Sequence, residues 1–220
     1  MPLTVAVGDA RDAFEASVIA FSGAVTSLEE WDLLASSRCH GWSRLEVATH
    51  LVAGWQEMLA GFVTLVDDDP TVDAASYWRA FGDMTSACDP VDVLMAQRRR
   101  AAAYARPSAV LAQLGDVADA VLSGGRAMGG RPCRWQGQVF APGDFLAIWA
   151  VENVVHHLDL LVEGRPPSSG LTLARATVEA LAEEPLPGEW TDEQAVLIGT
   201  GRLPVPAEAA TLSSRFPVLH

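Results

Sequence analysis

The sequence predicts an all-α fold, an up-and-down bundle of four helices with a short C-terminal extension. Four long stretches repeat apolar residues at three- and four-residue steps, which is the period of an amphipathic helix. Clusters of proline, glycine and aspartate separate these stretches, and only one short segment has strand character. Half of the 220 residues are hydrophobic, so a chain of this length can bury a sizeable core. We expect residues 1–165 to form the bundle and residues 166–220 to pack on it as the extension.

The first helix is expected from about Asp9 to Leu34. Its apolar residues share one stripe of the helix surface, and this stripe consists of Phe14, Val18, Phe21, Val25 and Leu28. The second helix has a strong start signal, because Ser43 followed three residues later by Glu46 is typical of a capping box. It should run to about Val66, before the breaker Asp67–Pro70.

A shorter helix is expected around Ser76 to Met84. The third long helix should begin at Asp89-Pro90, where the aspartate caps the helix and the proline occupies its first turn. Pro107 must kink or interrupt this helix before Val110 to Leu122, since proline removes a helical hydrogen bond.

The segment from Gly124-Gly125 to Gly143 has the composition of a loop, with Trp135 to Phe140 as a short strand. The fourth long helix is expected from about Pro142 to Glu163. It is apolar on nearly every side, so it should lie at the centre of the bundle. A short helix from Gly170 to about Glu184 and a tail over residues 190–220 complete the extension.

The charge of the chain argues against nucleic-acid and membrane partners. Fifteen basic and 28 acidic residues give a net charge of −13, which repels phosphate backbones and anionic lipid. All 15 basic residues are arginine, so mechanisms that need a lysine amine are excluded. The three cysteines are unclustered and predict neither a disulfide framework nor a zinc knuckle. Because the sequence has no signal-peptide pattern and no apolar run of membrane-spanning length, we expect a cytoplasmic protein.

Three residues in the central helices have the chemistry of metal ligands. Glu152 and His156 are four residues apart in the fourth helix, so their side chains share one face, while His157 is turned away from it. His50 lies inside the second helix. Two ligands from one helical turn and one from a facing helix can hold a divalent metal in a bundle core. Such ligands suit zinc and other first-row metals, and three of them leave a coordination position open.

Each of these residues also has a plainer interpretation. A glutamate and a histidine four residues apart can form an intrahelical hydrogen bond or a solvated pair. A single histidine such as His50 can be a core residue whose ring nitrogens are satisfied by neighbours. The sequence around the three residues favours the metal site.

Two motifs carry a family resemblance. Residues 39–51 read Cys-His-Gly-Trp-Ser-Arg-Leu-Glu-Val-Ala-Thr-His-Leu, and residues 149–159 contain Glu, three residues, His, His and, two positions further, Asp. Both resemble motifs of the DinB/YfiT-like metalloenzyme superfamily, and in particular of its mycothiol-dependent maleylpyruvate isomerase family. The tail, with Trp190 and Gly199 to Pro204, is also similar to the C-terminal ending of this branch.

The resemblance implies the fold and the ligands. It implies a DinB-like up-and-down four-helix bundle that holds a divalent metal, most often Zn²⁺, with Ni²⁺, Co²⁺, Fe²⁺ or Mn²⁺ as other options. The metal-binding residues of the family map onto His50, Glu152 and His156. The resemblance also implies a low-molecular-weight thiol, mycothiol, as cosubstrate.

The activity implied by the resemblance is a mycothiol-dependent transferase or isomerase, in which a metal-bound thiolate attacks a small electrophile. Because the C-terminal extension is short, we expect S-transfer as much as isomerisation. Two other classes stay open, a non-enzymatic metal-containing binding or regulatory protein and a metal-dependent hydrolase. Thiol-dependent turnover separates the first class from the other two. The expected partners are a small thiol and a small electrophile, and the expected state is a monomer or a homodimer.

Four further residues are candidates for the site. Arg79 and Arg202 could each bind a substrate carboxylate through the two-pronged guanidinium, or form a surface ion pair. Asp159 could accept a hydrogen bond from a metal-binding imidazole, or lie on the surface. Cys39, in the loop before the second helix, could approach the metal with its sulfur.

Overall fold

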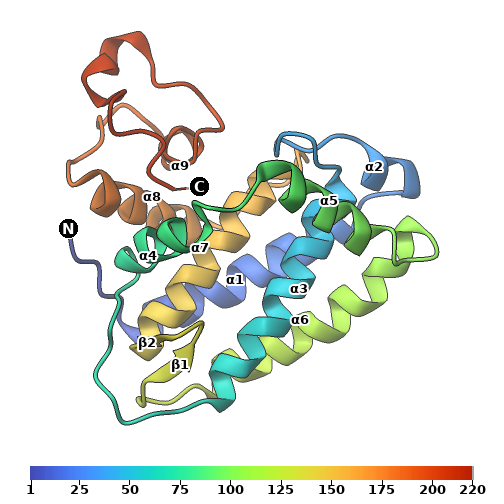
Figure 1. Ribbon diagram of the computed structural model, residues 1–220, viewed down its shortest axis with the longest axis horizontal. Helices are drawn as coiled ribbons and strands as arrows, with labels where there is room; N and C mark the ends of the chain where they lie inside the picture. Colours follow the sequence, from blue (N-terminus) through green and yellow to red (C-terminus); the bar gives the residue numbers. More distant parts are fainter. Residues whose placement is uncertain (220) are drawn as a thin grey trace.

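Four long helices form the body of the protein. The structure, a computed structural model, describes residues 1–219. Figure 1 shows the four helices side by side, with α1 packed on α6 and α7, and α3 packed on the same two helices. They are α1 (Val7–Thr26), α3 (Arg44–Val63), α6 (Val110–Ala127) and α7 (Pro142–Asp159). The predicted all-α helical bundle is confirmed.

The first helix was predicted as one piece, and this is wrong. The structure ends α1 at Thr26 and starts a separate helix α2 at Glu30–Leu34. The reason is local capping, because the Glu29 side chain accepts from the backbone of Asp32 and the Asp32 side chain accepts from the backbone N–H of Glu29. This reciprocal cap begins a new helix in place of continuing the old one.

Helix α3 starts where the capping box predicts. Ser43 Oγ accepts from the backbone N–H of Glu46 at 3.2 Å, and Glu46 Oε2 accepts from the backbone N–H of Ser43 at 2.6 Å. The helix ends at Val63, three residues before the predicted Val66. It ends early because the backbone N–H of Val66 donates to the carbonyl of Pro132 at 3.0 Å, which requires an extended chain.

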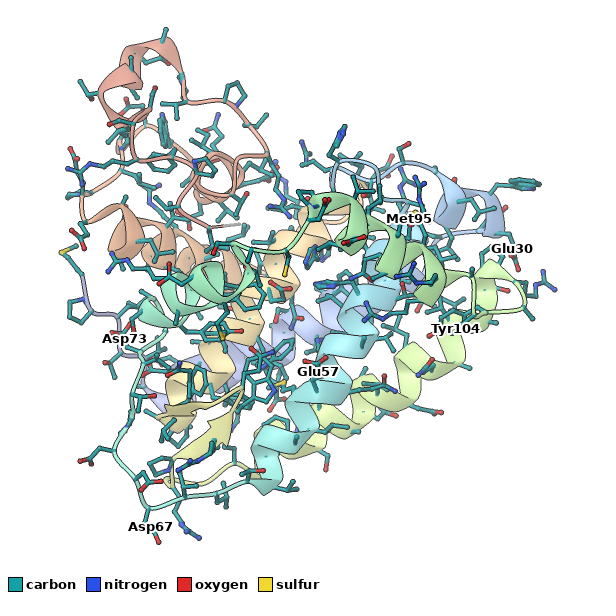
Figure 2. The ribbon with its side chains drawn as sticks, in the orientation of Figure 1. Glu30, Glu57, Asp67, Asp73, Met95 and Tyr104 are labelled. Atoms are coloured by element: carbon teal, nitrogen blue, oxygen red, sulfur yellow. The ribbon has the colours of Figure 1, made fainter. Side chains whose placement is uncertain are left out.

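Two short helices, α4 (Ser76–Thr85) and α5 (Pro90–Ala101), connect α3 with α6, and α5 packs on α3. Helix α4 was predicted as a short helix, and α5 is the first part of the third long helix, which is interrupted before α6 as Pro107 predicts. Asp89 caps α5 by accepting from the backbone N–H of Val91 at 2.8 Å. A single turn, η1 (Pro107–Ala109), leads from α5 into α6. Figure 2 labels Met95 on α5 and Tyr104 in this connection.

Helix α6 continues through Gly124 and Gly125, which were predicted to start a loop. The neighbouring aromatic rings explain why the helix keeps its glycines. A Cβ atom on Gly124 would lie 2.4 Å from the ring of Phe62, and one on Gly125 would lie 3.0 Å from the ring of Phe14. The glycines therefore allow α6 to approach α3 and α1 closely, and this packing offsets their low helix propensity.

The predicted single strand is a hairpin of two strands, β1 (Cys133–Trp135) and β2 (Gln138–Phe140). Cys133 lies opposite Phe140 in the antiparallel pair. The turn residues Gln136 and Gly137 have φ angles of 46° and 76°. A two-residue turn with both φ angles positive matches the twist of a hairpin.

Helix α7 is the central helix, as predicted, and every residue in it is buried except Glu152. It ends at Asp159, four residues before the predicted Glu163. Leu161 has a φ angle of 55°, which turns the chain out of the helix. The turn is held by His157, whose Nε2 atom lies 3.1 Å from the carbonyl oxygen of Gly164.

The extension contains helix α8 (Ser168–Ala182), helix α9 (Asp192–Gly199) and the short η2 (Ala207–Leu212). Figure 1 shows it at one side of the bundle, where α8 packs on α1 and α7. Part of it forms a small apolar cluster of its own around Trp190 and Ile198. The domain boundary at residue 165 stays a prediction. Within residues 1–219, no helix is long and apolar enough to cross a membrane.

Candidate metal centre

His50, Glu152 and His156 meet between α3 and α7, as their helical positions predict. The Glu152 Oε1 atom lies 3.0 Å from His50 Nε2 and 3.2 Å from His156 Nε2. One donor atom from each residue lies within 4.8 Å of the other two. The site opens to solvent on one side, because 30% of the His50 side chain and 21% of the Glu152 side chain are exposed.

The three residues form an unusual cluster of charge in the bundle interior. Burial favours the neutral form of Glu152, but the charge and hydrogen bonds of His156 and His50 outweigh it and hold the pKa of Glu152 well below its usual range. Burial likewise opposes charge on His156, yet the carboxylates of Glu152 and Asp159 raise its pKa well above the usual value. Burial lowers the pKa of His50. A carboxylate shared by two imidazoles is thus kept ionised, as a metal ligand must be.

A chain of contacts orients the His156 ring. Its Nδ1 atom lies 3.0 Å from Asp159 Oδ2, and Asp159 is fully buried. Arg202 from the extension donates to both oxygens of Asp159, with Nε to Oδ1 and Nη2 to Oδ2 each at 2.7 Å. Because Asp159 holds the Nδ1 proton of His156, the proton displaced by a metal would be the one on Nε2, and this would leave the Nε2 lone pair free to bind the metal.

A second set of donor atoms, from Cys39, His156 and Asp159, also lies within 4.8 Å. Cys39 Sγ is 3.0 Å from Asp159 Oδ2, as expected for a sulfur that approaches the site. The Arg202 guanidinium already binds two of these three residues, because it donates to both Asp159 oxygens and its Nη2 atom lies 3.6 Å from Cys39 Sγ. A cation would have to displace that positive charge, so we favour the set formed by His50, Glu152 and His156.

Helix α5 contributes a contact that the sequence did not predict. Gln97 is buried and its Nε2 atom lies 3.1 Å from His50 Nδ1. Arg100 in turn donates to Gln97 Oε1. These contacts hold the His50 ring from the side opposite to Glu152, with Nδ1 as acceptor and the proton on Nε2. A metal at Nε2 would require that proton to move to Nδ1 and the Gln97 amide to turn its oxygen toward the ring. A glutamine in a predicted helix carries no signal of this role, because its partner lies 47 residues away in sequence.

The two arginines considered for substrate binding or an ion pair both form ion pairs with carboxylates of the protein. Arg79 donates to Glu183 Oε1 at 2.9 Å and to the carbonyl of Leu181 at 3.2 Å, so it joins α4 to the end of α8. Arg202 lies at the site, but its guanidinium is committed to Asp159. Asp159 lies beside His156 and not on the surface. Substrate binding by either arginine stays a prediction.

The donor set fits a divalent metal. Two imidazole nitrogens and one carboxylate oxygen converge, and each ligand is held from behind by Gln97 or Asp159 or by its helix. Three protein ligands leave room for an external ligand. Two hollows, of about 130 and 750 Å³, are lined by His157 and Leu161 and by none of the three ligand residues.

The cap of α3 should influence the centre. Replacing Ser43 by alanine removes the hydrogen bond to Glu46 and is expected to cost ~1 kcal/mol of stability. It should also weaken metal binding, because α3 carries His50 two turns further on. Chemical denaturation and a metal titration check the two effects, with Thr191→Ala, which removes the equivalent cap of α9, as the control. A stability loss with unchanged metal affinity would make the cap purely structural.

A bundle in which one helix supplies a histidine and its neighbour supplies a glutamate and a histidine four residues apart has the architecture of a metal-binding helical bundle. Residues 14–161 match the mycothiol maleylpyruvate isomerase N-terminal domain family. The chain therefore belongs to this family, which confirms the resemblance drawn from the two motifs.

Solved structures agree on the fold. The chain is similar to the crystal structure of the mycothiol-dependent maleylpyruvate isomerase, with a TM-score of 0.56 and 13% sequence identity, over 80% of this chain and 72% of that one. A histidine-to-alanine mutant of that isomerase aligns with a TM-score of 0.55 at the same identity and coverage. A comparison with curated proteins finds no match.

Proposed function

We propose that the protein is a metal-dependent transferase or isomerase that uses a small thiol, with mycothiol as the cosubstrate. The observation that carries the proposal is the convergence of His50 Nε2 and His156 Nε2 on one carboxylate oxygen of Glu152 at a partly exposed position. Family membership supports mycothiol as the thiol. The proposed partners are therefore this thiol and a small electrophile.

The site residues have two roles: some would bind the metal, and others orient the residues that bind it. His50, Glu152 and His156 would bind the divalent metal, with Zn²⁺ as the proposed ion. When bound, the metal supplies a Lewis acid that lowers the pKa of a thiol ligand, so that thiolate is present at neutral pH. Asp159 keeps the Nδ1 proton of His156 in place, and Arg202 keeps Asp159 ionised.

Thiol transfer is favoured over hydrolysis by the state of the nearby carboxylates. A hydrolase needs a general base within reach of the attacking water. Asp159 is buried and bonded to Arg202 and His156, and Glu152 lies between two imidazoles. Neither carboxylate is free to accept a further proton, so neither can serve as the general base. A thiolate is already deprotonated and can attack the electrophile without such a base.

Cobalt loading tests thiol binding directly. Addition of mycothiol to the cobalt-loaded protein is expected to produce a new charge-transfer absorption band, because sulfur coordination gives such a band and oxygen or nitrogen ligands do not. Turnover with an electrophile should have an acidic limb below the ~8.5 of a free cysteine thiol. The control is His50→Ala, which should lose the band. A cobalt spectrum unchanged by saturating mycothiol would contradict the proposal and favour a binding protein.

A further inference from the structure

Helix α5 reaches the candidate centre through Gln97. Figure 1 shows α5 beside α3, the helix that carries His50, and Figure 2 labels Met95 two residues before Gln97 on α5. Of the 12 residues of α5, only Gln97 and Ala101 are buried. The buried face of a helix is normally apolar, and glutamine is mostly found exposed. A buried amide at this position is therefore explained by its hydrogen bonds and not by packing alone.

The contacts of the Gln97 amide determine which way it faces. Arg100 has only N–H donors, and it donates to Gln97 Oε1. The amide nitrogen of Gln97 therefore points at His50 Nδ1, 3.1 Å away, and donates to it. A ring nitrogen that accepts a hydrogen bond carries no proton. The proton of a neutral His50 ring thus lies on Nε2, which is 3.0 Å from Glu152 Oε1.

Metal binding needs the opposite arrangement of the His50 ring. Nε2 is the nitrogen that faces Glu152, so it must offer its lone pair to the metal, and the ring proton must lie on Nδ1 and find an acceptor. Gln97 supplies that acceptor when its amide turns over, because the oxygen and nitrogen of an amide occupy nearly the same space. The turned amide directs its N–H groups at Arg100, which is exposed and can move into solvent.

We propose that Gln97 is a positioning residue whose amide turns over when the centre takes up its metal, and that Arg100 opposes metal binding by holding the metal-free orientation. This inference rests on the metal site of the proposed function. Arg100 and the Nδ1–H of His50 compete for one oxygen atom, Gln97 Oε1. The two residues of α5 therefore set the metal affinity of the centre, with opposite signs.

The other histidine of the centre has a partner without this competition. His156 Nδ1 lies 3.0 Å from Asp159 Oδ2, and Arg202 donates to both oxygens of the same carboxylate. A carboxylate has enough lone pairs to accept from the ring and from the guanidinium at once. The Gln97 amide has a single oxygen. Replacement of Gln97 by glutamate would give His50 the same kind of partner that His156 has.

Zinc titrations against a chelator test the role of the Gln97 oxygen. Gln97→Glu should bind zinc about tenfold more tightly than the wild type, because a carboxylate accepts from Nδ1–H and from Arg100 together. Gln97→Met keeps the length of the side chain without a comparable acceptor and should bind zinc about tenfold more weakly. The controls are Gln138→Glu and Gln138→Met, which change a glutamine of the hairpin that bonds Thr71. Equal weakening by both Gln97 substitutions would overturn the proposal.

A double-mutant cycle tests the competition with Arg100. Arg100→Met should raise the zinc affinity by about 3–10-fold, because the amide turns over without leaving a charged donor. Loss of a positive charge could raise the affinity by itself, so the same substitution is made in the Gln97→Met protein. A gain that disappears in that background shows that Arg100 acts through the amide. An equal gain in both backgrounds would overturn the competition.

Nitrogen NMR of the imidazole ring observes the tautomer directly. The His50 proton should be on Nε2 in the metal-free protein and on Nδ1 in the zinc-loaded protein. The side-chain amide signal of Gln97 should shift on addition of zinc, and the signal of Gln138 should not. A proton that stays on His50 Nε2 in the zinc-loaded protein would overturn the proposal, because that nitrogen could not bind the metal.

These measurements also separate the role of Gln97 from the thiol chemistry. If the zinc affinity changes in the Gln97 and Arg100 variants as expected but no electrophile is turned over with mycothiol, the role of Gln97 stands and the proposed function fails. If turnover depends on mycothiol but all variants bind zinc equally, the function stands and the role of Gln97 is overturned. Failure of the wild-type protein to bind zinc would overturn both.

Discussion

Replacement of Glu152 by alanine is expected to lower the affinity for zinc by roughly 10²–10³-fold, so that the protein is purified almost without metal. The estimate follows because the ~10–16 kcal/mol of a structural zinc site is shared among about four ligands. Glu152 is also the residue that both imidazoles contact. Metal analysis of the purified protein, followed by titration against a chelator, measures the loss.

The neighbouring histidines of α7 provide a matched comparison. His156 and His157 are both buried, but only His156 lies beside Glu152, whereas His157 bonds the carbonyl of Gly164. His156→Ala should lose metal to the same extent as Glu152→Ala, and His157→Ala should keep it despite a similar cavity. Full occupancy in the Glu152 and His156 variants would show that the metal, if any, binds elsewhere.

Replacement of Asp159 by asparagine should have the largest effect on stability, about 3–5 kcal/mol, because it leaves the Arg202 guanidinium largely buried without a counter-charge. Only 15% of the Arg202 side chain is exposed, and none of Asp159. The same variant should weaken metal binding by about 10–100-fold, since a neutral amide replaces the charged carboxylate that accepts from His156 Nδ1. Denaturant unfolding and metal titration measure the two effects.

The stability difference should depend on pH in a defined direction. Burial raises the pKa of Asp159, but the hydrogen bonds from Arg202 and His156 outweigh it and hold the pKa well below its usual range. A group with a depressed folded pKa stabilises the protein above its unfolded pKa, about 4, and loses this contribution as the pH falls through the folded value. The wild type should therefore exceed the variant by a constant amount from pH 5 to 7 and by less below pH 4.

A double variant tests whether the buried pair acts as a unit. Asp159→Asn together with Arg202→Met removes both charges, so it should recover part of the stability that Asp159→Asn alone loses. Metal affinity should stay low in the double variant, because the charged carboxylate beside His156 is still missing. Additive losses of stability in the two single variants would mean that the contact between Arg202 and Asp159 contributes little.

Local signals explain which parts of the fold could be predicted. The capping box of Ser43 and Glu46 and the Asp89-Pro90 start are encoded within four residues, and the structure places both helix starts there. The continuation of α6 through its glycines depends on Phe62 and Phe14, which come from other helices. The chain leaves α7 at Leu161, which has a positive φ angle. The identity of a leucine does not predict this conformation, so the end of the helix could not be predicted from the sequence.

The contacts of the candidate centre likewise fall into those that the sequence predicts and those that only the folded chain shows. Glu152 and His156 are neighbours on one helical turn, so periodicity alone places them together. The contacts of Cys39 with Asp159 and of Arg202 with Asp159 join residues 120 and 43 positions apart, and only the folded chain shows which partner each one meets. For this reason the sequence could name Arg202 as a candidate site residue, for a substrate carboxylate or for an ion pair, but could not identify Asp159 as its partner.

The position of Arg202 near the end of the chain has a consequence for the order in which the site is built. During synthesis His50, Glu152 and His156 all leave the ribosome before Arg202 does. Until the guanidinium arrives, Cys39, His156 and Asp159 present an unguarded thiol, imidazole and carboxylate, which soft metals such as copper prefer to the nitrogen and oxygen set. The second donor set is therefore covered only once the C-terminal extension has folded and Arg202 has packed against Asp159 and Cys39.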